Sequence, residues 1–202
     1  MRRLLVLSLI ASLASYVHAA EVVGYGEVDG QNVELLSDGT WQLVRAAETE
    51  AGDCPKGVLA ESSLLPVALC FKQAIWREAP KADAFEQRYV TKSGELWAGV
   101  ITERIPIGPA LIRDAILANA QRDGTKARNV TDLDPVVLGP ELRLDALSYI
   151  MDVKDTEFWA TVYYGPIHGE GTLQIMFWTV SALAEDASVH IPPVVKSLRI
   201  IR

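Results

Sequence analysis

His168 and Glu170 lie two residues apart in a glycine-rich segment and form the clearest starting point for chemistry in this chain. A His-x-Glu pair could begin a metal site or act as an acid–base pair. A zinc site needs three or four ligands, and after residue 19 the only other histidine is His190. Because glycine readily adopts positive φ, the alternative interpretation is an exposed hairpin tip without a chemical role. The pattern therefore does not by itself predict catalysis or a bound metal.

Cys54 and Cys70 are the two cysteines of the chain. An isolated pair of cysteines usually forms a disulfide in an oxidising compartment, whereas a redox-active dithiol normally has Cys-x-x-Cys spacing. Without histidines nearby, the two thiols also make a poor zinc site. The sequence therefore predicts a structural Cys54–Cys70 disulfide.

Acidic residues in the second half of the chain could suggest a calcium site or a glycosidase; they are Asp132, Asp134, Asp152, Asp155 and Glu157. The Asp132–Pro135 stretch lacks the glycine and distal glutamate of an EF-hand, and a glycosidase pair is defined by a distance in space. The chain has no Gly-x-Ser-x-Gly elbow, no P-loop and no dinucleotide-binding glycine pattern. We expect solvated loop acids and assign no catalytic, metal-binding or cofactor-binding residue.

Two strand-like segments, residues 158–164 and 172–180, carry apolar side chains at both alternating positions. A strand of this kind is central and covered on both faces, or keeps one face for a partner. Its aromatic residues could line a ligand groove if the strand register places them together. The predicted ligand surface consists of Trp159, Tyr163, Met176 and Trp178.

The elements that would position these residues fall into four segments. We expect a signal peptide at residues 1–19, a β-hairpin or meander at 20–45 with two Asp-Gly turns, a small acidic linker at 46–57, and an α+β domain at 58–202. Within the last segment, periodicity predicts a hairpin, a helix, three strands and a short helix, in this order: 85–103, 109–122, 142–153, 157–164, 172–180 and the residues from Pro192 onward. Residues 124–140 are polar and are expected to be mostly loop.

This order predicts an α+β fold in which helices pack on an antiparallel sheet. Two helices suffice to cover one face only, so the other face or an edge would present apolar and aromatic side chains to a partner.

Part of this pattern resembles the Mog1/PsbP-like fold, including bacterial proteins of the DcrB type. The resemblance covers about residues 85–201 and rests on Trp97–Ile101 leading through Ile105-Pro106 into the helix, on the strands 159–164 and 174–178, and on the closing Lys196-Ser197-Leu198. It implies a non-enzymatic binding or accessory role and carries over no site residues, because that fold hosts unrelated functions. Residues 33–41, which end in Asp-Gly-Thr-Trp, also resemble a short hairpin near the mature N-terminus of various exported bacterial proteins.

The first nineteen residues have the layout of a secretory signal peptide, with Arg2 and Arg3, an apolar run at 4–13, and Val17-His18-Ala19 before the cleavage site. The run is too short to span a bilayer comfortably, and no second segment reaches that length. We expect a mature chain that begins at Ala20 in the periplasm, with secretion from the cell as the alternative.

With 26 acidic and 19 basic residues, the chain is a poor candidate for binding nucleic acid or an anionic membrane surface.

These features together predict a non-catalytic periplasmic binding or accessory protein without a cofactor, whose partner would be an envelope protein, a peptide or a lipid-like ligand. Two alternatives stay open. One is an envelope hydrolase with a carboxylate or His168-centred site, and the other is a structural protein-interaction module whose N-terminal β unit docks on another protein.

Overall fold

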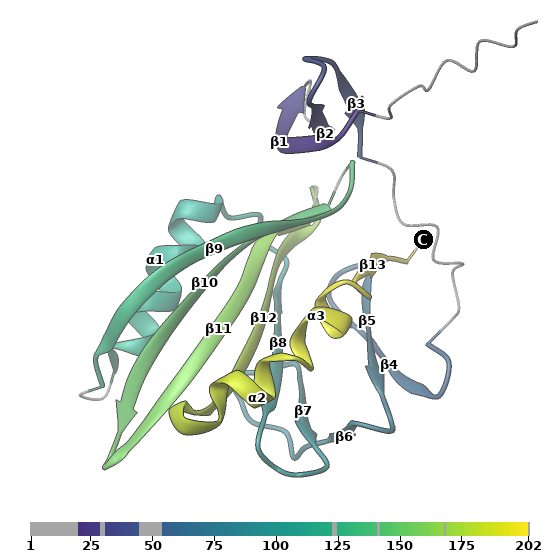
Figure 1. Ribbon diagram of the computed structural model, residues 1–202. Helices are drawn as coiled ribbons and strands as arrows, with labels where there is room; N and C mark the ends of the chain where they lie inside the picture. Colours follow the sequence, from purple (N-terminus) through teal and green to yellow (C-terminus); the bar gives the residue numbers. More distant parts are fainter. Residues whose placement is uncertain are drawn as a thin grey trace, which may run out of the picture.

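The computed structural model describes residues 20–28, 31–44, 54–122, 125–140, 142–167 and 169–201 (Figure 1). Three antiparallel sheets organise these residues, with the strand orders β1-β2-β3, β6-β7-β8-β12-β11-β10-β9 and β13-β5-β4. The predicted signal peptide and most of the predicted linker lie outside the described residues and stay predictions. Among the described residues, no helix is long and apolar enough to cross a membrane.

The seven-stranded sheet is the centre of the molecule. Its strands are β6 (Trp76–Glu78), β7 (Gln87–Thr91), β8 (Trp97–Glu103), β9 (Ala127–Gly139), β10 (Leu142–Val153), β11 (Thr156–Ile167) and β12 (Gly171–Val180). The hairpin expected at 85–103 corresponds to β7 and β8, and the three later strands correspond to β10, β11 and β12. In β11 and β12, the apolar residues at both alternating positions agree with a central place in a sheet that has packing layers on both sides.

The expectation that residues 124–140 are mostly loop is wrong, because residues 127–139 form the edge strand β9. An edge strand tolerates charged side chains and Pro135, since one row of its backbone groups has no partner strand. Its pairing with β10 also shifts register three times, and Asn129 has a φ of 52°. These irregularities and the polar composition remove the alternation by which strands are recognised.

Helices cover both faces of this sheet rather than one, as Figure 1 shows. Helix α1 (Pro109–Ala120) packs Ile112, Ile116 and Ala120 on one side, which we call the α1 face. The opposite side, the α3 face, carries η2 (Ser181–Leu183), α2 (Ala184–Ser188), α3 (Ile191–Val195) and a small sheet of β4 (Gly57–Glu61), β5 (Val67–Lys72) and β13 (Arg199–Ile200). The expectation that helices pack on one face only is therefore wrong, since residues 57–72 and the C-terminal segment add a second layer on the α3 face.

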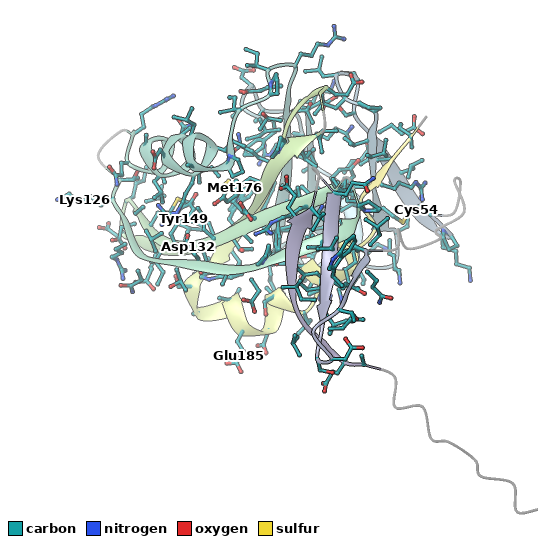
Figure 2. The ribbon with its side chains drawn as sticks, turned by 90° about the horizontal axis from the view of Figure 1, so that it is seen from above. Cys54, Lys126, Asp132, Tyr149, Met176 and Glu185 are labelled. Carbon is teal, nitrogen blue, oxygen red and sulfur yellow. A yellow bond between two sulfur atoms is a disulfide. The ribbon has the colours of Figure 1, made fainter. Side chains whose placement is uncertain are left out.

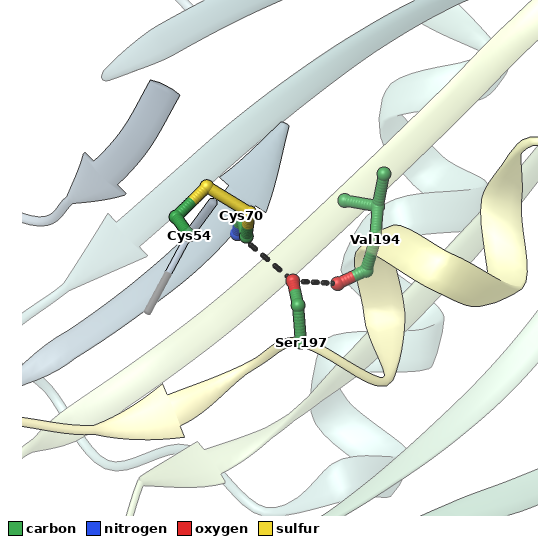
Figure 3. The surroundings of a disulfide bond; sticks show 4 residues. All are labelled: Cys54, Cys70, Val194 and Ser197. Atoms are coloured by element: carbon green, nitrogen blue, oxygen red, sulfur yellow. Dashed lines mark hydrogen bonds between the residues drawn. A yellow bond between two sulfur atoms is a disulfide. The ribbon is translucent and has the colours of Figure 1, made fainter. Parts of the chain in front are cut away.

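The predicted disulfide is present and joins Cys54, which precedes β4, to Cys70 of β5 with a Cα–Cα distance of 5.4 Å. The backbone N–H of Cys70 donates to Ser197 Oγ at 2.8 Å, and Ser197 Oγ donates to the carbonyl of Val194 at 2.6 Å (Figure 3). Gly57 is required beside the disulfide, because a Cβ there would overlap the Sγ of Cys54. The start of β4, the strand β5 and the end of α3 are thus held at one point.

A separate three-stranded sheet, β1 (Val22–Val28), β2 (Gln31–Leu36) and β3 (Trp41–Leu43), contacts the main sheet through Asn32. The Asn32 N–H donates to the carbonyl of Pro140 at 2.9 Å, and its side-chain Nδ2 donates to the carbonyls of Gly139 and Pro140. Most other large apolar residues of this sheet are exposed, among them Trp41. The N-terminal sheet is therefore attached at the turn between β9 and β10.

Candidate functional site

The four residues predicted to share a ligand surface lie on opposite faces of the sheet. In the β11–β12 pairing, Met176 lies opposite Val162, so even-numbered residues of the two strands share a face. Met176 and Trp178 therefore point to the α1 face, whereas Trp159 and Tyr163 point to the α3 face and pack against its core. All four side chains are half-buried. The structure thus brings together only Met176 and Trp178.

A groove with a volume of about 300 Å³ opens on the α1 face. This volume is at the lower end of the roughly 300–1,000 Å³ of small-molecule sites. Strands β8, β12, β11 and β10 form its floor, α1 forms one wall, and the segment before β7 forms the other. Figure 2 shows Tyr149 and Met176 on the side of the sheet toward α1, with Glu185 of α2 on the opposite side. The lining residues are Ala84, Phe85, Ile101, Ile116, Asn119, Ala120, Arg122, Tyr149, Met151, Val162, Gln174 and Met176.

Phe85 forms one wall of the groove because Gly99 leaves room for its ring on the sheet. A Cβ at position 99 would overlap the ring atoms of Phe85. The ring stacks on Trp178 with a centroid distance of 5.4 Å, and Trp178 stacks on Trp97 at 6.1 Å. The Arg88 guanidinium lies 4.9 Å from the Trp97 ring centroid and 5.8 Å from that of Phe85, within cation–π range. We call this stack the Phe85 wall, and contacts within the protein hold it together.

Glu86 follows Phe85 and fixes the segment before β7 in place. Its carboxylate accepts hydrogen bonds from the Oγ atoms of Ser62 and Ser63 at 2.9 and 2.8 Å, from the Ser63 N–H, and from Thr102 Oγ1. Partial burial acts to raise the pKa of Glu86, but the hydrogen bonds from Thr102, Ser63 and Ser62 outweigh it and lower the pKa below its ordinary value. Glu86 therefore stays ionised at neutral pH and anchors the Phe85 wall to β8 and to the β4–β5 loop.

The polar groups that line the groove are a phenol, two amides and a guanidinium. Burial raises the pKa of Tyr149 to about 12, so its phenol stays protonated at neutral pH and can donate a hydrogen bond. Asn119 and Gln174 are neutral amides, and Arg122 Nη2 donates to Asn119 Oδ1 at 2.6 Å. Among the residues that the structure describes, the groove lining includes no Asp, Glu, His, Cys or Ser. They therefore supply a guanidinium and neutral hydrogen-bonding groups, without a paired nucleophile and base.

The acidic residues considered for calcium binding or glycoside hydrolysis lie partly in ion pairs. Asp132 of β9 pairs with Arg113 of α1 at 2.9 Å. Asp152 pairs with Arg128 at 3.2 Å, and the same arginine contacts Glu157. These three acids belong to β9, β10 and β11, whereas loop positions were expected. In this arrangement they connect neighbouring elements across the surface.

His168 lies outside the described residues, so its place at an exposed hairpin tip stays a prediction. Glu170, its expected partner, is exposed in the turn before β12. Across the part of the chain that the structure describes, no three His, Cys, Asp or Glu side chains gather as a metal site.

Sequence patterns indicated Met176 and Trp178, which lie on the α1 face, but not Phe85, Tyr149 or Arg122, which line the groove. Gly99 offered a usable signal, since glycine inside a strand often marks the close approach of another group.

Comparisons with known proteins give a likeness of structure alone. No family model matches the chain, and a search of curated proteins finds no significant match. The structure of cyanobacterial PsbP from Synechocystis is similar with a TM-score of 0.49 and 10% identity, over 75% of this chain and 95% of that one. A crystal structure from Bacteroides thetaiotaomicron is similar with a TM-score of 0.46 and 12% identity, over 73% of this chain and 50% of that one. The first likeness agrees with the predicted PsbP-like resemblance, while the DcrB-type and N-terminal hairpin details stay predictions.

Proposed function

We propose that this chain is a non-catalytic, exported binding protein whose ligand is a small, largely apolar molecule held in the groove on the α1 face. The observation that carries the proposal is a groove of about 300 Å³ with an apolar floor across four strands and a wall of stacked aromatic rings. Moving an apolar ligand from water onto such a floor contributes about 0.8 kcal/mol per buried methylene. Stacking and cation–π contacts within the protein hold this wall, which lowers the entropy cost of ordering it on binding.

Export to the periplasm is part of the proposal and has two supports. The first nineteen residues have the layout of a signal peptide. The Cys54–Cys70 disulfide is typical of proteins that fold in an oxidising compartment. Fractionation of cells that express the full chain, followed by N-terminal sequencing, tests this part, and recovery of the cytosolic protein with Met1 would contradict it.

Titration with the neutral fluorescent probe N-phenyl-1-naphthylamine tests the binding itself. Ala84→Trp places a large ring at the groove, and Ala182→Trp places the same ring at an exposed position on the α3 face. We expect saturable binding to the native protein, at least tenfold weaker binding to Ala84→Trp, and unchanged binding to Ala182→Trp. Equal binding by all three proteins, or no binding by the native protein, would contradict the proposal, provided that circular dichroism shows all three folded.

The interaction-module alternative has one structural observation in its favour. Register places Leu35 opposite Trp41 and Val33 opposite Leu43, so one face of the N-terminal sheet presents Leu35, Trp41 and Leu43, all of them exposed. This face is separate from the groove lining. Trp41→Ser should therefore leave probe binding unchanged, and a loss of probe binding in that variant would show that the two regions act together.

A further inference from the structure

The groove has an unusual charge for this protein. The chain has 26 acidic and 19 basic residues, yet the described residues that line the groove include one cation and no carboxylate. That cation is Arg122, which follows the C-terminal end of α1. A ligand with a negative charge would therefore meet an attractive charge at the groove and no repulsive one among its lining residues.

Arg122 also differs from the arginines that hold the surface together. Arg113, Arg128 and Arg143 each lie within 4.0 Å of a carboxylate. For Arg122, the side-chain partner within the described ranges is the neutral Oδ1 of Asn119. A guanidinium has five N–H donors in a planar fork, so one bond to Asn119 orients the group and leaves donors for a ligand.

We infer that the groove binds a single-chain amphipathic carboxylic acid, with its hydrocarbon part on the sheet floor and its carboxylate at Arg122. This inference rests on the proposed function. A planar guanidinium and a carboxylate form two parallel hydrogen bonds, which suits Arg122 to this headgroup. The volume of about 300 Å³ favours one short chain over a lipid with two acyl chains.

The side chains on the floor match the two parts of such a ligand. Ile101, Val162 and Met176 offer apolar contacts on β8, β11 and β12. Ile116 of α1 and the ring of Phe85 enclose the chain from the two sides. The acid would thus lie between α1 and the Phe85 wall, with its charged end toward the end of α1.

Isothermal titration calorimetry with decanoate, decan-1-ol and decyltrimethylammonium tests the inference. These probes share a ten-carbon chain and differ in headgroup charge. We expect the native protein to bind decanoate at least tenfold more tightly than decan-1-ol, and the cationic probe most weakly. Shortening the acid to nonanoate and octanoate should weaken binding about fourfold per methylene. Raised salt should weaken the binding of decanoate and leave that of decan-1-ol unchanged.

Arg122→Gln should weaken decanoate binding at least tenfold and leave decan-1-ol binding unchanged. The matched control is Arg77→Gln, which removes the same charge from an exposed position on β6 outside the groove and should change neither affinity. Equal native affinities for decanoate and decan-1-ol, or an Arg122→Gln protein that binds decanoate normally, would overturn the carboxylate inference and leave the proposed function standing. If the native protein binds none of these probes and no naphthylamine, both proposals fail.

Discussion

Replacing both cysteines with serine removes the disulfide and should lower the free energy of unfolding by about 3 kcal/mol. The estimate follows from the sequence separation of 16 between Cys54 and Cys70, since closing a loop of this size restricts the unfolded chain by about that amount. The folded state should change little. The Cys70 N–H is a backbone donor, so its hydrogen bond to Ser197 persists in the double variant, and β4 still pairs with β5.

A loss of about 3 kcal/mol corresponds to a fall in Tm of roughly 6–12 °C, because 1 kcal/mol shifts the Tm of a domain of this size by about 2–4 °C. Differential scanning calorimetry of the oxidised native protein and of the double variant measures this difference. The control is the native protein in reductant, whose Tm should match that of the variant.

Two results would refute this reasoning. Two free thiols in the denatured, unreduced native protein would show that the disulfide does not form. A quantitatively formed disulfide whose loss changes Tm by less than about 2 °C would show that the unfolded chain is not restricted as the loop length implies.

The other predictions concern the Phe85 wall. Gly99→Ala places a methyl group where the Phe85 ring lies, so it should lower the free energy of unfolding by about 1–3 kcal/mol and change the near-ultraviolet circular dichroism of the tryptophan stack; an unchanged spectrum and stability would contradict the close contact. Glu86 has a lowered pKa in the folded protein, so its contribution to stability is present above its ordinary pKa of 4.5 and is lost as the pH falls through the lowered value. Glu86→Gln should therefore be less stable at pH 7 and lose less stability between pH 7 and pH 3 than the native protein in urea unfolding, and parallel pH profiles would refute this assignment.

Local patterns predicted the regular elements of the main sheet because those elements are apolar, long and bounded by turns. Long strand-like runs bounded by turns located β10, β11 and β12, and Pro109 marked the start of α1. Residues 58–84 contain shorter strands, β4 to β6, which had too little alternation to be recognised. Without them, the second covering layer and hence the covered α3 face could not be foreseen.

The groove was only partly predictable because it depends on register. The hairpin between β11 and β12 closes with Ile167 opposite Gly171, and this spacing assigns Met176 to the α1 face and Tyr163 to the other. A shift of one residue would reverse that assignment, and composition does not determine it. No local sequence pattern distinguishes Arg122, since its proposed role depends on the apolar surface that folding places beside it.

The irregularity of the edge strand β9 bears on aggregation when the protein is concentrated. A long free edge could otherwise template hydrogen bonding with a second copy and extend the sheet from molecule to molecule. Asp132 and Asp134 would bring like charges close together in such a pairing, and Pro135 offers no N–H to it. The three register shifts further disrupt the straight ladder that a growing fibre needs. The features that make β9 hard to recognise in the sequence are therefore also those that oppose edge-to-edge aggregation.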